Sequence, residues 1–148
     1  MGKTFGCIFY TDLRPKEFIL EKCRQTLREN CPYPIVSVSL HKPIDLGTNI
    51  CITDRDRSYP TMVFQIVTAL EALDTDYVFF LEHDVLYHPS HFDFTPPTDT
   101  IYYYNVNNYR WYVKEDFAIT YDGLHSLSMM CCNRELALKH FKARLAWI

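Results

Sequence analysis

Acidic side chains directly follow the most apolar stretch of this chain, residues 77–81. The stretch ends abruptly at Glu82, His83 and Asp84. The alternation of a β-strand places Glu82 and Asp84 on one face, a short distance apart. Two carboxylates on a rigid strand end suit Mg²⁺ or Mn²⁺ when waters and phosphates supply the remaining ligands. Acidic residues that follow a strand often cap the next helix or face solvent in other proteins. Here the close spacing of residues able to bind a metal favours a metal site at Glu82 and Asp84.

The segments that must position this run begin with a predicted β-α-β unit. Residues 4–10 are apolar and rich in strand-forming types. Pro15 opens a helix with apolar residues at every fourth position, and Asn30 and the prolines after it end that helix. Residues 35–40 alternate as a second strand, followed by a loop that contains Gly47. A unit of this kind has parallel strands and a right-handed crossover.

A second helix is expected after residue 57, with Ser58 as its N-cap and Pro60 in its first turn. Its buried stripe comprises Val63, Ile66, Val67, Leu70 and Leu73. The strand at 77–81 is apolar on both faces, as a central parallel strand is. Open α/β sheets bind ligands at the carboxyl ends of strands, near a switch in strand order. The acidic run lies at such an end.

The second half predicts a mixed extension of the sheet. Strands are expected at 101–104, 110–113, 117–121 and 126–132, with a hairpin turn at 114–116. Asn133 caps a last helix whose inward face carries Leu138, Phe141 and Leu145. The sequence therefore predicts an α/β fold: one Rossmann-like, three-layer α/β/α domain over residues 1–148, with a mixed, mainly parallel central sheet.

Composition limits the possible partners. The 148 residues are 48% hydrophobic and carry a net charge of −3, so no overall positive field attracts nucleic acid, although a local patch would suffice. The six cysteines have neither zinc-ribbon spacing nor a clear disulfide pattern, which favours reduced thiols. No segment approaches the roughly 20 apolar residues of a transmembrane helix. We expect a cytoplasmic protein with no membrane partner; the oligomeric state is left open.

The order of these segments, and the triplet Glu82-His83-Asp84 at the strand end, resemble the GT-A glycosyltransferases of the family 2-like group. The resemblance implies that Asp84 binds the metal and that Glu82, a Glu where the family commonly has Asp, contacts the ribose or a metal-bound water. It also implies a nucleotide-sugar donor, with a UDP-sugar expected, and donor contacts at the first strand end and the second helix. The expected donor residues are Tyr10, Thr11, Asp12, Arg14, Arg57, Ser58, Glu82 and His83.

Within the GT-A group, residues 57–92 are most similar to small phage and bacterial members. That group includes enzymes associated with TET/JBP-type base hydroxylases, which glycosylate hydroxymethylated DNA bases. The resemblance thus implies an acceptor hydroxyl on a glycan or on hydroxymethylated DNA. The aromatic and Asn-rich segment 102–112 suits an acceptor with a flat face, and Trp111 and Tyr112 are the expected contacts.

Inverting transfer, the outcome that this group implies, also needs a base. The family places an acidic base beyond the last helix, which leaves Asp116 and Asp122 as candidates here. Asp116 belongs to the expected hairpin turn, so Asp122 is the expected base, unless the chain is a C-terminally minimal version that lacks one. Some GT-A enzymes place a late histidine on the metal, which here is His125.

Three other functions remain open: a non-catalytic sugar-nucleotide-binding module, a nucleotidyltransferase, and a metal hydrolase. A nucleotidyltransferase would need a basic, glycine-rich loop near the first strand to bind the triphosphate, and the sequence has no glycine-rich loop there. The hydrolase would combine Glu82 and Asp84 with His88 and His91.

Overall fold

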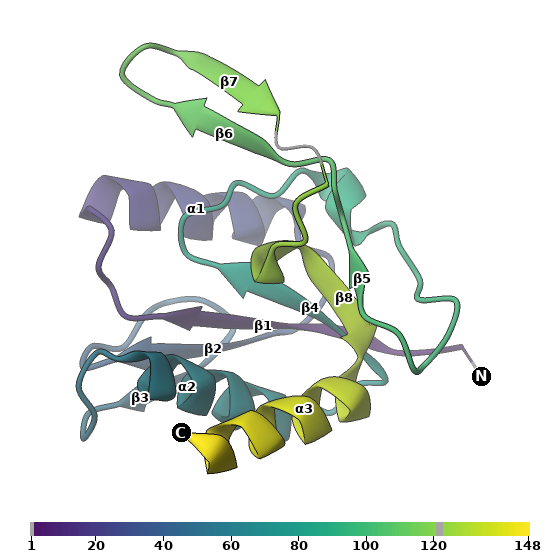
Figure 1. Ribbon diagram of the computed structural model, residues 1–148. Coiled ribbons are helices and arrows are strands. Elements are labelled where there is room, and N and C mark those ends of the chain that lie inside the picture. Colours follow the sequence, from purple (N-terminus) through teal and green to yellow (C-terminus); the bar gives the residue numbers. More distant parts are fainter. Residues whose placement is uncertain (1, 121–122) are drawn as a thin grey trace.

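The computed structural model of the chain describes residues 2–120 and 123–148. Its centre is a six-stranded sheet in the order β3-β2-β1-β4-β8-β5 (Figure 1). Strands β3, β2, β1 and β4 are parallel, and β8 runs antiparallel to both of its neighbours. The strands are β1 (Phe5–Thr11), β2 (Ile35–Leu40), β3 (Thr48–Ile52), β4 (Tyr77–Glu82), β5 (Tyr103–Tyr104) and β8 (Met130–Asn133). The expected mixed, mainly parallel sheet is confirmed.

Three helices cover this sheet as its outer layers. Helix α1 (Glu17–Asn30) lies on one face, and α2 (Tyr59–Ala72) and α3 (Arg134–Trp147) lie on the other (Figure 1). Ser58 caps α2 by accepting a hydrogen bond from the Thr61 N–H at 3.1 Å, as expected. Asn133 caps α3 in the same way through the Leu136 N–H at 3.1 Å.

Alternate residues of the central strands divide the core into two clusters. Ile8 of β1 and Phe80 of β4 face α2 and α3, whereas Phe9 and Leu81 face α1. The expected stripe of α2 is buried as predicted. From β1 the chain passes through α1 to β2, which lies on one side of β1 in the sheet. The later strand β4 lies on the other side of β1, so strand order switches between β1 and β4. The carboxyl ends of these two strands therefore flank the position where this type of sheet binds ligands.

One predicted loop is a strand, and two predicted strands are shorter than expected. The segment after Gly47 was expected to be a loop, but it forms β3, which pairs with β2 at the edge of the sheet. Of residues 126–132, the first part instead forms the short 3-10 helix η2 (Leu127–Met129), so that only Met130 onwards joins the sheet. Residues 101–104 contribute only the two-residue strand β5.

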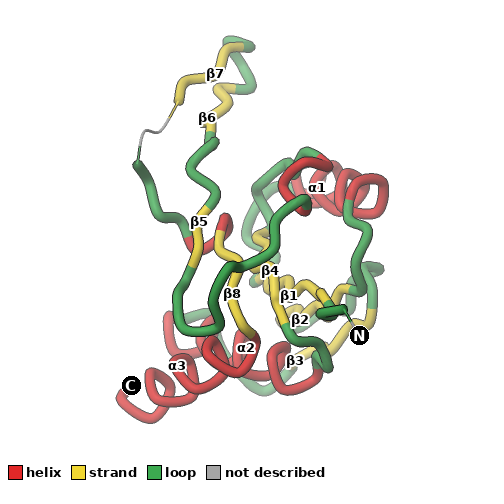
Figure 2. Tube along the Cα trace, turned by 90° about the vertical axis from the view of Figure 1, so that its right-hand side faces the viewer, coloured by secondary structure: helices red, strands yellow, loops and turns green. Residues whose placement is uncertain are grey.

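Strands β6 (Tyr109–Tyr112) and β7 (Phe117–Thr120) form a separate antiparallel hairpin. It extends away from the three layers in both views (Figures 1 and 2), and most of its side chains are exposed. Asp116 closes the turn with a positive φ of 53°, and its N–H donates to the Tyr112 carbonyl at 2.8 Å. The expected hairpin turn is therefore confirmed, but its strands do not extend the central sheet.

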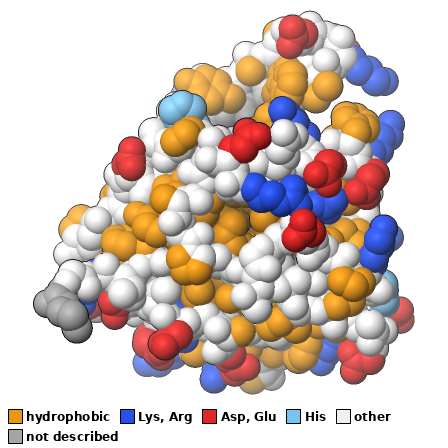
Figure 3. All heavy atoms as spheres, turned by 180° about the vertical axis from the view of Figure 1, so that it is seen from behind, with side chains coloured by type: hydrophobic (Ala, Val, Ile, Leu, Met, Phe, Trp, Pro, Cys, Tyr) orange, Lys and Arg blue, Asp and Glu red, His pale blue; other side chains and the backbone are white. Residues whose placement is uncertain are grey.

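The face covered by α1 carries both signs of charge (Figure 3). Arg24 pairs there with Glu17 and Glu21, each at 3.0 Å, and Arg28 pairs with Glu21 at 3.4 Å. Interspersed charges of this kind give no uniform positive face for nucleic acid. All six cysteines are free thiols, in agreement with the sequence-based expectation. Among the described residues, no helix has both the length and the apolar character needed to cross a membrane.

Candidate functional site

An open cavity of about 430 Å³ lies at the carboxyl ends of β1 and β4, against the start of α2. All the residues expected to contact the donor line it, together with Asp84. The end of β1 supplies Tyr10, Thr11, Asp12 and Arg14, the approach to α2 supplies Arg57 and Ser58, and the end of β4 supplies Glu82, His83 and Asp84. The fold thus brings together residues that are up to 74 positions apart (10 to 84).

Tyr10 and Glu82 are register partners on neighbouring strands, and both face α2. The Tyr10 hydroxyl donates a hydrogen bond to Glu82 Oε1 at 2.5 Å. Burial raises the pKa of Glu82, the charge of Asp84 raises it further, and the bond from Tyr10 opposes the increase. Burial and the nearby Glu82 carboxylate raise the pKa of Tyr10 well above its usual value, so its hydroxyl keeps its proton. The pair is a fixed, partly buried acid at the cavity wall.

His83 is held by the end of β1. Thr11 Oγ1 lies 2.7 Å from His83 Nδ1, and it also accepts a hydrogen bond from the Leu13 N–H at 3.0 Å. The hydroxyl that accepts from Leu13 can donate its own proton to Nδ1, which leaves the proton of the ring on Nε2. Burial lowers the pKa of His83, against the opposing charges of Asp84 and Asp12. A neutral imidazole therefore lines the cavity, held at Nδ1 by Thr11.

Two guanidinium groups converge on Asp12. Arg14 lies 3.3 Å from its carboxylate, and Arg57 Nε donates to its backbone carbonyl at 3.1 Å. The turn that carries Asp12 and Arg14 includes Leu13 at a positive φ of 59°, a backbone conformation that favours glycine. Strain of this kind in a non-glycine residue persists only where surrounding contacts hold it, and it is commonest at binding and catalytic sites. Two guanidinium groups thus lie beside the acidic strand end, both in contact with Asp12.

The carboxylates at the end of β4 fit a hard divalent cation only in part. Asp84 is exposed at the cavity wall, whereas Glu82 Oε1 is already engaged by Tyr10. Among the residues that the structure describes, no three His, Cys, Asp or Glu side chains are grouped as a complete metal cage. Mg²⁺ and Mn²⁺ commonly take one or two carboxylates and fill the other positions with waters and substrate phosphates. Asp84, with Glu82 beside it, fits that pattern.

His125, the third expected metal ligand, does not line this cavity. Its ring stacks on Tyr104 at 4.9 Å with an interplanar angle of 6°. The two histidines of the hydrolase alternative are also elsewhere. His88 Nδ1 lies 2.8 Å from Ser90 Oγ, and His91 is buried beside Tyr87, where burial lowers its pKa to about 4. Neither histidine is among the lining residues of the cavity.

The expected acceptor residues lie on the β6–β7 hairpin, away from this cavity. Trp111 is half exposed, and its Nε1 donates to Asp116 Oδ1 at 3.3 Å, while Tyr112 stacks on Phe117 at 4.9 Å. Neither lines the cavity. The expected base, Asp122, is outside the described residues, so its role stays a prediction.

Sequence reasoning missed Gln65 of α2. Its buried side chain donates to the Thr11 carbonyl at 2.9 Å and to the Val38 carbonyl at 3.1 Å, which fixes α2 to the carboxyl ends of β1 and β2. The available signal was a lone amide between Val63 and Ile66 in an otherwise apolar stripe. A buried amide needs partners, and carbonyls at strand ends supply them.

Comparison of the chain with models of known protein families and with curated protein sequences finds no match.

Proposed function

We propose that this chain is a metal-dependent GT-A glycosyltransferase that moves a sugar from a nucleoside-diphosphate donor, UDP-sugar first among those to test, to an acceptor hydroxyl. One observation carries the proposal. The cavity at the switch in strand order combines a carboxylate pair, Glu82 and Asp84, with two guanidinium groups, those of Arg14 and Arg57. That combination matches a ligand whose phosphates need both a divalent cation and direct charge-assisted hydrogen bonds.

The transfer is a substitution at the anomeric carbon of the donor. The acceptor oxygen forms a bond to that carbon, the bond from the carbon to the diphosphate breaks, and its electron pair leaves with the nucleoside diphosphate. The acceptor proton passes to a base, for which Asp122 remains the candidate. Asp84 would hold a Mn²⁺ or Mg²⁺ ion, which would supply Lewis-acid neutralisation of the leaving phosphates.

The side chains of the cavity have distinct parts in this proposal. Arg14 and Arg57 bind the phosphates and stabilise the charge that develops on the leaving group. Neutral His83 offers its Nε2–H as a donor to an uncharged or anionic group of the donor substrate. The Tyr10–Glu82 pair supplies a rigid acceptor for a ribose hydroxyl or a metal-bound water. Gln65 holds the start of α2 at the fixed distance that this arrangement needs.

A thermal-shift experiment tests the binding step. UDP and Mn²⁺ together should raise the melting temperature more than the sum of their separate effects, because their ligands are shared. Asp84→Ala should abolish that excess, whereas Asp74→Ala, an exposed Asp before β4 at the opposite end of the sheet, should keep it. Retention of the excess in folded Asp84→Ala would remove Asp84 as a metal ligand.

Turnover separates a transferase from its alternatives. Labelled UDP-sugar and Mn²⁺ are supplied with hydroxymethylated DNA, unmodified DNA and simple glycans in parallel. Label on any acceptor supports transfer and identifies the acceptor class. Binding of UDP with no transfer to any of them would favour a non-catalytic sugar-nucleotide-binding module, and release of pyrophosphate from a nucleoside triphosphate would favour a nucleotidyltransferase.

A further inference from the structure

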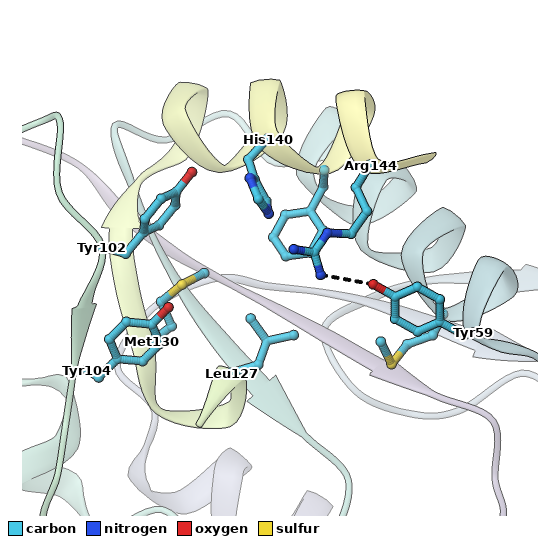
Figure 4. Close-up of a pocket in the computed structure, with 9 residues that line it drawn as sticks. Tyr59, Tyr102, Tyr104, Leu127, Met130, His140 and Arg144 are labelled. Atoms are coloured by element: carbon cyan, nitrogen blue, oxygen red, sulfur yellow. Dashed lines mark hydrogen bonds between the residues drawn. The ribbon is translucent and has the colours of Figure 1, made fainter. Parts of the chain in front are cut away.

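A second cavity, of about 310 Å³, lies beside the first and shares Tyr59 and Met62 with it. Figure 4 shows its residues converging from α3, from the strand region around β5 and β8, and from the start of α2. Its volume is near the lower end of the roughly 300–1,000 Å³ that is typical of ligand sites. The cavity therefore suits a single ring with its substituents.

The walls of this second cavity are aromatic and held in place. The Tyr102 hydroxyl donates to the Leu136 carbonyl at 3.4 Å, and its ring lies edge-on to His140 at 5.8 Å. His125 stacks on Tyr104, as described above, which fixes the orientation of that ring. Burial raises the pKa of both Tyr102 and Tyr104, so their hydroxyls are uncharged at neutral pH. Rings fixed in this way form a pre-arranged surface for a flat ligand.

Arg144 gives the cavity its charge. Its Nη1 donates to the Tyr59 hydroxyl at 2.9 Å (Figure 4), and its guanidinium lies 5.9 Å from the centre of the Phe141 ring. The lining contains no carboxylate, and the ion pairs formed within residues 2–120 and 123–148 do not include Arg144. Partial burial and the charge of Arg144 lower the pKa of His140, which leaves that ring neutral. A single guanidinium thus stands at an aromatic cavity with no acidic partner.

We propose that this cavity is a second ligand site, which takes a planar ring bearing a phosphate or a carboxylate, with the anion at Arg144. The ring lies among Tyr102, Tyr104 and Met130, where stacking and burial stabilise it. Resting on the proposed function, we assign the acceptor to this site, because it adjoins the donor cavity and Tyr59 and Met62 line both.

The test uses phenyl phosphate as its probe, titrated calorimetrically into the whole chain with UDP and Mn²⁺ at saturation to fill the first cavity. Arg144→Gln should weaken binding by about 10–100-fold, since charge-assisted hydrogen bonds contribute roughly 1.5–3 kcal/mol. Tyr59→Phe keeps the ring but releases Arg144, and it should weaken binding by roughly 2–10-fold. Lys139→Gln removes the same charge from the exposed face of α3, outside the cavity, and should have little effect.

Parallel arms identify the source of the ring and the anion. Benzoate, thymidine 5′-monophosphate and a short single-stranded oligonucleotide are compared with phenyl phosphate, and phenyl glucoside serves as the neutral control. Stronger binding of the nucleotide probes identifies a nucleic-acid acceptor, and stronger binding of benzoate identifies a small aromatic acid. Equal affinity of Arg144→Gln and the unchanged protein for phenyl phosphate, or tighter binding of the neutral glucoside, would overturn the proposal.

The two proposals fail in distinguishable ways. If UDP and Mn²⁺ bind but phenyl phosphate does not, the second site is refuted and the donor site stands. If UDP and Mn²⁺ do not bind, but phenyl phosphate binds in a manner that depends on Arg144, the second ligand site stands and its role as the acceptor site is refuted along with the proposed function.

Discussion

The hydroxyl of Tyr10 and the carboxylate of Glu82 are joined by a 2.5 Å hydrogen bond across the boundary between β1 and β4. This boundary is where strand order switches, and both side chains line the first cavity. Both side chains are largely withdrawn from water. The pair therefore links the stability of the sheet to the ionisation of a group at the candidate site.

Tyr10→Phe removes the hydroxyl and leaves the partly buried carboxylate without this donor. We expect a loss of about 1–3 kcal/mol in the free energy of unfolding at pH 7, the usual result when a buried polar partner is removed. The loss should be smaller at pH 4, where a larger fraction of Glu82 is protonated. Urea unfolding at both pH values measures it, with Tyr109→Phe on the exposed hairpin as the control. A pH-independent loss would mean that Glu82 does not ionise in the folded protein.

Glu82→Gln should make the protein more stable than the unchanged chain at neutral pH. The folded pKa of Glu82 is raised above the ordinary value of 4.5, so the folded state holds the proton more tightly than the unfolded state. The stability of the unchanged protein should therefore fall as the pH rises from about 4.5 through the raised pKa, and Gln removes that loss. Unfolding curves from pH 4 to pH 8 should diverge in favour of the variant. Parallel curves would contradict the raised pKa.

Gly47→Ala and Gly123→Ala form a matched pair that separates the cost of a positive φ from the cost of a steric clash. Both glycines have a positive φ, 56° and 69° respectively. A Cβ at Gly47 would lie 2.1 Å from the Ile35 carbonyl oxygen, whereas a Cβ at Gly123 meets nothing within 4 Å. We expect about 1 kcal/mol of destabilisation at Gly123 and clearly more at Gly47, measured by urea unfolding. Equal losses would mean that the turn before β3 moves freely to admit the side chain.

Arg57→Gln should weaken the binding of UDP in the presence of Mn²⁺ by about 10–100-fold, because a charge-assisted contact with the diphosphate is lost. Arg55→Gln is the control. Its guanidinium lies 3.8 Å from the centre of the Phe64 ring, and it does not line the cavity. Titration calorimetry at two salt concentrations gives both affinities. Unchanged affinity in Arg57→Gln would place the phosphates elsewhere.

Sequence reasoning predicted the fold where the period of apolar residues is unambiguous. The stripe of α2 and the run at 77–81 are buried as expected, and the caps at Ser58 and Asn133 start their helices. It failed at β3, where Gly47 and Asn49 suggested a loop. The amide of Asn49 instead bonds to Ser37 Oγ at 3.0 Å, so a turn-forming residue is accommodated at the sheet edge by a side-chain partner in β2.

The part of the candidate site at the ends of β1 and β4 was predictable for a topological reason. Parallel strands bring their carboxyl ends to one edge of the sheet. Asp12 and Asp84 therefore line the same cavity, although no local sequence pattern connects them. The second cavity had no such signal. Tyr59 lies on α2, whereas His140 and Arg144 lie on α3. The distance between these side chains depends on how the two helices pack and on the angle between them. The prediction of Trp111 and Tyr112 as acceptor residues rests on the aromatic and Asn-rich composition of their segment, which does not specify where the β6–β7 hairpin lies relative to the cavity.

Tyr59 and Met62 line both cavities, so ligands bound on the two sides would be coupled through these side chains. A ligand that orders Tyr59 from one side changes the free energy of binding on the other side, and thermodynamic linkage makes this coupling reciprocal. The factor by which phenyl phosphate changes the affinity for UDP must equal the factor by which UDP changes the affinity for phenyl phosphate. A single shared side chain would thereby couple occupancy of the two cavities without any movement of the sheet.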